Sequence, residues 1–143
     1  MTSHRYTGSC HCGNITLEIE LTKPPGAYHP RACDCNFCRR HAAAYVSDPR
    51  GRLAIRVERE PDLGRYRQGN ELADLVFCRT CGILVGVIWS DKRRLYGAVN
   101  ARALPDLAGL GPDTPVSPKT LSAQAKIERW KSLWFSDVKL SVG

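Results

Sequence analysis

The segment "CDCNFCRRH", residues 33–41, places three cysteines within six residues. Two further pairs, Cys10 with Cys12 and Cys78 with Cys81, complete the seven cysteines of the chain. Clustered cysteines in an odd number are more typical of metal ligands or catalytic thiols than of a disulfide framework. The spacing therefore predicts metal coordination, and the question is how seven thiols divide between ions.

Tetrahedral zinc binds four ligands, with sulfur at about 2.3 Å, so neighbouring ligand sulfurs lie roughly 3.8 Å apart. Cys-x-x-Cys in a turn and Cys-x-Cys on extended chain both allow that separation. Neither pair closes a site alone, whereas the cluster in residues 33–38 offers three ligands by itself. The most economical division is a four-cysteine group of Cys10, Cys12, Cys78 and Cys81, and a triplet of Cys33, Cys35 and Cys38.

A closed site with four cysteines is typical of structural zinc, and three protein ligands with an open position are typical of catalytic zinc. We therefore interpret the four-cysteine group as structural and the triplet as catalytic or substrate-binding. Rubredoxin-like iron or free reduced thiols are alternatives for the four-cysteine group. For the triplet, the alternatives are a second structural site completed by His41, His29, Asp34 or water, or metal-free redox thiols.

The hydrophobic pattern predicts a mainly β protein. In "NITLEIEL", residues 14–21, apolar and polar side chains alternate, as in a strand with one buried face. "RLAIRVER", residues 52–59, repeats the pattern, and "LADLVFC", "GILVGVIW" and "RLYGAVNA" indicate further strands. "CRTCG", residues 78–82, lies between two of these, so we expect a hairpin turn that carries two thiols.

The C-terminal third of the chain is less regular. Residues 101–118 are rich in Gly, Pro and Asp and indicate an irregular connection. Ile127, Trp130 and Trp134 recur at helical spacing, but no cap is evident in residues 119–135, so we expect either a helix or irregular structure there.

Composition and length favour one soluble domain over residues 1–143. The hydrophobic content of 43% in 143 residues is enough for a single core. The sequence shows neither a leader-like segment nor eighteen consecutive apolar residues, so we expect a cytoplasmic protein without membrane contact.

Four motifs carry a resemblance to a known family: "GSCHCGNI", "CDCNFCRR", "FCRTCG" and "VNARALPD". In this order and spacing, between Gly8 and Asp106, they resemble the glutathione-dependent formaldehyde-activating enzyme (GFA) family, also called the CENP-V/GFA domain. The resemblance implies a mainly β, Mss4-like (β-tent) fold, with antiparallel sheets built around zinc-binding hairpins.

The resemblance also implies two zinc ions, a structural one in the four-cysteine group and a catalytic one in the triplet. The implied activity is that of a carbon–sulfur lyase, which condenses formaldehyde with glutathione to S-hydroxymethylglutathione. Arg39 and Arg40 follow the triplet directly, so they are candidates for binding the carboxylates of glutathione, with solvated surface arginines as the alternative.

A second hypothesis is a zinc-binding module without catalysis, which binds nucleic acid or protein. The net charge of +7 and a set of cations near Tyr66 and Tyr96 favour nucleic acid. The basic residues are spread along the chain, however, and no recognition helix is evident, so a small thiol is the better supported partner. The cations in question are Arg65, Arg67, Lys92, Arg93 and Arg94.

Overall fold

The computed structural model describes residues 4–68, 71–105, 107 and 109–143, and most of the regular structure in them is β. One sheet has four strands in the order β1 (His4–Ser9), β2 (Ile15–Leu21), β5 (Arg52–Val57), β11 (Val138–Val142). The other has seven strands in the order β10 (Thr114–Val116), β3 (Arg31–Cys33), β4 (Ala44–Val46), β9 (Leu95–Asn100), β8 (Leu84–Ser90), β7 (Asp74–Cys78), β6 (Leu63–Tyr66). The prediction of a mainly β fold is confirmed.

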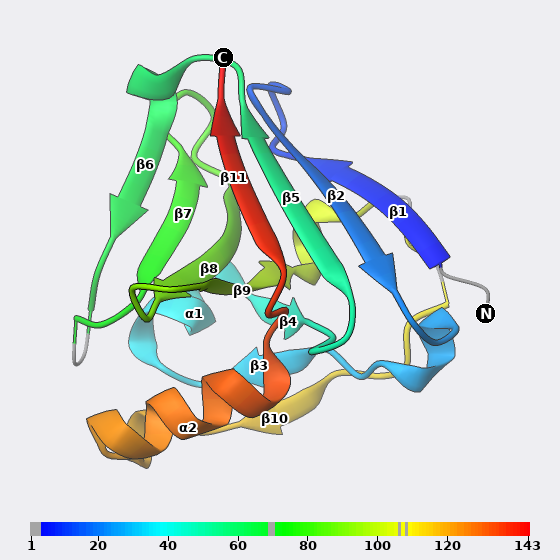
Figure 1. Cartoon of the computed structure of the whole chain (residues 1–143), viewed down its shortest axis with the longest axis vertical. Coiled ribbons are helices and arrows are strands. Elements are labelled where there is room, and N and C mark those ends of the chain that lie inside the picture. Colours follow the sequence, from blue (N-terminus) through cyan, green and yellow to red (C-terminus); the bar gives the residue numbers. More distant parts are fainter. Residues whose placement is uncertain (1–3, 69–70, 106, 108) are drawn as a thin grey trace.

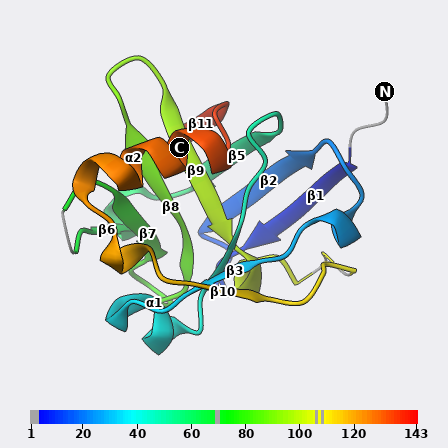
Figure 2. The ribbon, with the colours of Figure 1, turned by 90° about the horizontal axis from the view of Figure 1, so that it is seen from below.

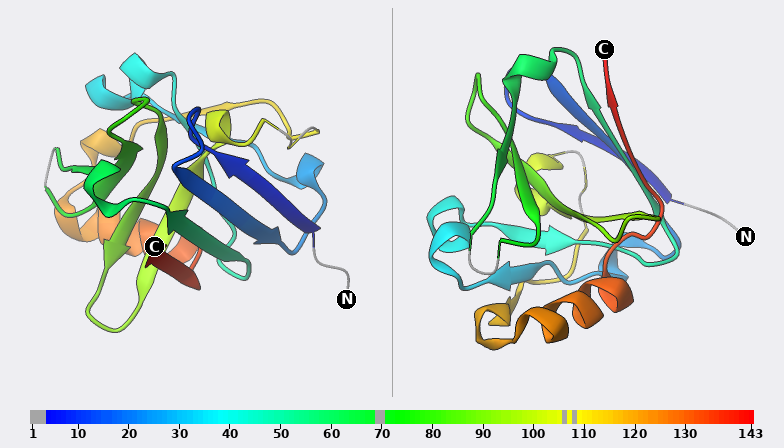
Figure 3. Two further views of the ribbon diagram at one scale, coloured as in Figure 1. Left: turned by 90° about the horizontal axis from the view of Figure 1, so that it is seen from above. Right: turned by 60° about the vertical axis from the view of Figure 1, so that its left-hand side comes forward.

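The two sheets lean together like the sides of a tent. In Figure 1 the strands β6 and β7 on one side and β11 and β5 on the other approach each other near the C-terminus and separate toward α2 (Ala123–Leu133). The right-hand view of Figure 3 shows the same wedge, with α2 beneath its wide end. This is the β-tent arrangement that the resemblance implied.

The alternating strands build the core between the sheets. β2 and β5 are antiparallel, and their register places Leu17 opposite Ile55 and Ile19 opposite Leu53. All four side chains are almost completely buried, so the apolar positions predicted from the sequence do face inward. Phe135 enters the same core from the segment after α2 and is fully buried.

A second core lies beside α2 and contains the triplet region. Trp130 and Trp134 of this segment stack at a centroid distance of 4.8 Å, and they pack with apolar residues of β7, β8 and β9. Figure 2 shows α2 lying across the strands β8 and β9. The helical spacing of the tryptophans therefore reflects burial of one face of a real helix.

The C-terminal region is more regular than we expected. Ser122 caps α2, because its side chain accepts a hydrogen bond from the Ala125 N–H at 3.1 Å, a cap that the sequence analysis missed. β10 and β11 were not predicted, and each pairs in parallel with a distant strand, β3 and β5 respectively. Neither α2 nor the six-residue α1 (Asn36–His41), the α-helices in the described ranges, is long and apolar enough to cross a membrane.

Asp48 connects the segment after β4 to the end of β2. Its carboxylate accepts hydrogen bonds from the Thr22 N–H, the Thr22 hydroxyl and the Tyr28 hydroxyl at 2.9, 2.7 and 2.6 Å, and from the Arg50 N–H at 2.9 Å. Burial alone would raise the pKa of Asp48, but these hydrogen bonds outweigh it and lower the pKa below the ordinary 3.8. The charged form is therefore the one that stabilises the fold.

Candidate metal centres and the adjoining pocket

The four-cysteine group is assembled as the sequence predicted. The four sulfurs lie within 4.8 Å of one another. The Sγ of Cys12 is 3.7 Å from that of Cys10 and 3.6 Å from that of Cys78, close to the separation of about 3.8 Å between neighbouring thiolates on tetrahedral zinc. Cys12 and Cys78 are 66 positions apart, so the group joins the β1–β2 turn to the β7–β8 turn.

Both turns share one backbone design. Gly13 and Gly82, each directly after the second cysteine of its pair, have φ values of 84° and 81°. Each glycine donates its N–H to the carbonyl of the first cysteine of its pair, Cys10 at 3.2 Å and Cys78 at 2.7 Å. Because only glycine adopts this positive φ without strain, the "CG" in both motifs fixes the turn that presents the sulfurs.

The triplet comes from one short stretch. Cys33 ends β3, Cys35 precedes α1, and Cys38 lies on that helix. The Sγ of Cys35 accepts a hydrogen bond from the Cys38 N–H at 3.3 Å, which caps α1 and holds the two residues together. The three sulfurs lie within 4.8 Å of one another, and within the described part of the chain no histidine or carboxylate joins them.

The residues considered as a fourth ligand lie elsewhere. His41 is exposed, and its ring packs against Phe37 at a centroid distance of 4.7 Å. The Nδ1 of His29 lies 3.0 Å from a backbone carbonyl. Asp34 points one oxygen toward Lys119 at 3.8 Å. The triplet thus offers three protein ligands in the described structure.

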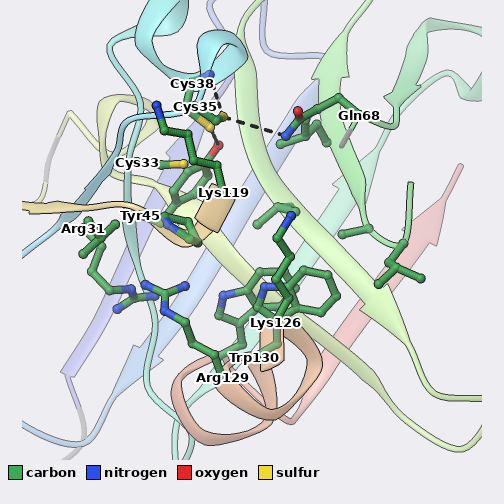
Figure 4. A pocket seen from close by; sticks show the side chains of 17 residues that line it. Arg31, Cys33, Cys35, Cys38, Tyr45, Gln68, Lys119, Lys126, Arg129 and Trp130 are labelled. Carbon is green, nitrogen blue, oxygen red and sulfur yellow. Dashed lines mark hydrogen bonds between the residues drawn. The ribbon is translucent and has the colours of Figure 1, made fainter. Parts of the chain in front are cut away.

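A pocket of about 190 Å³ opens over the triplet, and the four-cysteine group does not line it. Figure 4 shows the three sulfurs toward one end of the pocket and Arg129, Lys126 and Trp130 toward the other. The lining residues are Arg31, Cys33, Cys35, Cys38, Tyr45, Gln68, Leu72, Ala73, Leu75, Val87, Val116, Pro118, Lys119, Lys126, Arg129, Trp130 and Trp134.

Two polar side chains of the pocket contact the sulfurs. The hydroxyl of Tyr45 is 3.2 Å from the Sγ of Cys38, and the Gln68 amide donates to the Sγ of Cys35 at 3.8 Å. Burial, followed by the charges at Cys38 and Cys33, raises the pKa of Tyr45. Its phenol therefore keeps its proton and is a hydrogen-bond donor to sulfur.

The thiols of the triplet differ in acidity in the protein without metal. The hydrogen bond from Cys38 lowers the pKa of Cys33 to about 6, against the effect of burial. The pKa of Cys38 is raised, because its proton bonds to Cys33 and because it is buried. At neutral pH the triplet thus holds at least one thiolate, the form that binds metals.

Arg39 and Arg40, the predicted ligands of glutathione, are exposed on α1 and do not line the pocket. Their role in substrate binding stays a prediction. The cations that do line the pocket include Lys126 and Arg129, which the sequence analysis passed over. They lie three positions apart on α2, with Trp130 four positions after Lys126, so the helical spacing placed them on the face that carries the tryptophans.

Two of the cations considered for nucleic-acid binding are engaged within the protein. Arg65 and Arg67 contact the Asp74 carboxylate at 3.0 and 2.7 Å. Tyr96, one of the two tyrosines considered for base stacking, is buried. These contacts leave less of that cluster available to phosphates.

Comparison with known proteins agrees with the geometry. The family model described as "Glutathione-dependent formaldehyde-activating enzyme" matches residues 5–116, which extends the span of the four motifs at both ends. The chain belongs to this family. It is also similar to a Rhodobacter sphaeroides protein of known crystal structure, a structural-genomics target, with 32% sequence identity and a TM-score of 0.55 over 76% of this chain and 99% of that one. Both cysteine groups could hold metal ions, and their sulfur-only ligand sets are consistent with zinc.

Proposed function

We propose that the protein is a zinc-dependent carbon–sulfur lyase-like enzyme, which acts on a glutathione-type thiol and a small aldehyde such as formaldehyde. The observation that supports this most directly is the difference between the two cysteine groups. The group with three ligands opens into a pocket, while the group with four ligands does not. We assign structural zinc to the four-cysteine group and catalytic zinc to Cys33, Cys35 and Cys38.

In the proposed reaction, a sulfur–carbon bond forms between thiol and aldehyde. The carbonyl π bond breaks, and the proton that leaves sulfur ends on the oxygen, so nothing is oxidised or reduced. When bound at the triplet, zinc would supply an open position that stabilises a substrate thiolate or polarises the carbonyl.

The chain's own residues hold and enclose this site. Tyr45 and Gln68 bond to the sulfurs of Cys38 and Cys35 and so fix the directions of these ligands. The apolar walls, which include Leu75 and Val87, reduce the water around the reacting atoms.

The test is the rate of adduct formation from glutathione and formaldehyde with the zinc-loaded protein, compared with the spontaneous rate. We expect acceleration by the wild type, and a return to the spontaneous rate with Cys35→Ser. Elemental analysis is the matched measurement: two zinc ions per chain in the wild type and one in the variant. An acceleration that survives Cys35→Ser, or none at all from protein with two zinc ions, refutes the proposed enzyme.

A further inference from the structure

The pocket over the triplet is strongly cationic. Arg31, Lys119, Lys126 and Arg129 line it, and its described lining residues include no aspartate or glutamate. Lys119 has a partner nearby, since its Nζ is 3.8 Å from Asp34. Within the described residues, no ion pair involves any of the other three.

Arg31 is held in place by neutral groups. Its Nη2 donates to the Ser47 hydroxyl at 2.7 Å, and that hydroxyl donates to the Leu133 carbonyl at 2.6 Å. The guanidinium of Arg31 is therefore anchored to the C-terminal end of α2 without a counter-charge. A guanidinium has five N–H donors, so most of those on Arg31 stay available to a ligand.

Arg129 projects from α2 toward the same place. Figure 4 shows the guanidinium groups of Arg31 and Arg129 pointing toward one another at the end of the pocket opposite the sulfurs. Both side chains line the pocket and are only partly exposed. Two half-buried like charges that face each other raise the energy of the empty site, and an anion between them removes that cost.

We propose that Arg31 and Arg129 form a carboxylate subsite, so that the pocket selects an acidic thiol whose carboxylate binds between the two guanidinium groups while its sulfur reaches the triplet. This inference rests on the proposed function in one respect, that the substrate is a thiol. Arginine suits the role because its planar fork binds a carboxylate through two parallel hydrogen bonds.

The size of the pocket limits what enters with the carboxylate. Its volume of about 190 Å³ is below the roughly 300 to 1,000 Å³ typical of sites that enclose a drug-sized ligand. A tripeptide thiol therefore places only its thiol-bearing part and one acidic end inside. A small mercapto acid fits entirely, which makes it the cleaner probe.

The experiment compares the binding of 3-mercaptopropionate and its uncharged amide to the zinc-loaded protein. Calorimetry gives the dissociation constants, and tryptophan fluorescence reports the site independently. All three tryptophans of the chain lie in or next to the pocket wall, since Trp130 stacks on Trp134 at 4.8 Å and contacts Trp89 at 5.7 Å. We expect the acid to bind about ten- to a hundredfold more tightly than the amide.

Arg129→Gln should reduce that preference to less than about threefold and leave the affinity for the amide unchanged. Arg129→Lys, which keeps the charge but not the fork, should fall between the wild type and Arg129→Gln. Arg56→Gln is the matched control, because Arg56 is exposed on β5 and does not line the pocket. Unchanged binding of the amide shows that a variant is folded. If Arg129→Gln does not fold, Arg31→Gln provides a second measurement.

The outcomes separate this inference from the proposed function. Equal binding of acid and amide by the wild type, or a preference that survives both glutamine substitutions, overturns the carboxylate subsite and leaves a thiol enzyme possible. A preference that Arg129→Gln abolishes, in a protein that does not accelerate adduct formation, supports the subsite and refutes the enzyme. If neither thiol binds, the carboxylate subsite is overturned, and the assay of adduct formation from glutathione and formaldehyde decides the proposed function separately.

Discussion

The two cysteine groups should differ in how much they stabilise the fold, because they close loops of different length. The four-cysteine group connects residues 66 positions apart, whereas the triplet spans Cys33 to Cys38 only. By the entropy of loop closure, a cross-link over 66 residues contributes about 4 kcal/mol, and one over five residues about 2 kcal/mol. The structure therefore predicts a difference of about 2 kcal/mol between disrupting one group and disrupting the other.

The perturbation is a pair of matched double variants. Cys10→Ser with Cys12→Ser removes both ligands on the β1–β2 side, so no metal cross-link joins that turn to the β7–β8 hairpin. Cys33→Ser with Cys35→Ser also removes two thiols, one buried and one more accessible, but opens no long loop. We expect the first double variant to be less stable than the second by about 2 kcal/mol in urea unfolding of metal-loaded protein.

A chelator supplies the control. With the metal removed, the long-range cross-link is absent from every variant, so the difference between the two double variants should largely disappear. Equal losses of stability in the metal-loaded proteins would refute the reasoning. A difference that persists undiminished in chelator would do so as well, because it would then arise from packing of the cysteines and not from a metal cross-link.

Three further predictions concern the fold. Asp48→Asn should lower the free energy of unfolding by about 1 to 3 kcal/mol at neutral pH. Because the folded pKa of Asp48 lies below the ordinary 3.8, this loss of stability should be complete above about pH 4 and should shrink as the pH falls through the folded value. Urea titrations at acid pH would contradict this if the difference in free energy of unfolding between wild type and variant did not change with pH. Phe135→Ala should cost about 3 to 5 kcal/mol, since the ring is fully buried, and a midpoint in urea near that of the wild type would argue against it. Gly8→Ala should cost about 1 to 3 kcal/mol in the same assay, because the new methyl group would clash with the carbonyl oxygen of Ala103. An unchanged free energy of unfolding would contradict this prediction.

The strands of the core were predictable because their signal is local. In β2 and β5 the apolar residues alternate with polar ones, and burial of one face of a sheet requires that pattern. β11 shows why the same rule fails at an edge. Val138, Leu140 and Val142 do alternate with polar residues, but the strand has five residues and Val142 stays exposed, so its pattern does not stand out from irregular chain.

The helix α2 was only half predictable for a related reason. The tryptophan spacing is a local signal of a buried face, and Ser122 is an ordinary capping residue that the sequence analysis overlooked. The parallel pairing of β10 with β3 could not be predicted from a local signal. Its three residue pairs join segments more than 80 positions apart, and nothing within either segment specifies the partner.

The sequence by itself determined the local geometry of the cysteines in this protein. The spacings Cys-x-Cys and Cys-x-x-Cys, with glycine after each pair, fix the sulfur positions within each pair and within the triplet through covalent geometry over a few residues. The sequence predicted that the two pairs form one group, but the fold brings them together, because Cys12 and Cys78 are 66 positions apart. Only the tertiary structure decided which side chains lie in the pocket over the triplet. Arg31 on β3 and Arg129 on α2 line one pocket because the tryptophan face of α2 packs beside the seven-stranded sheet. Burial of that face depends on contacts between segments far apart in the chain, so the spacing of residues within either segment does not predict it.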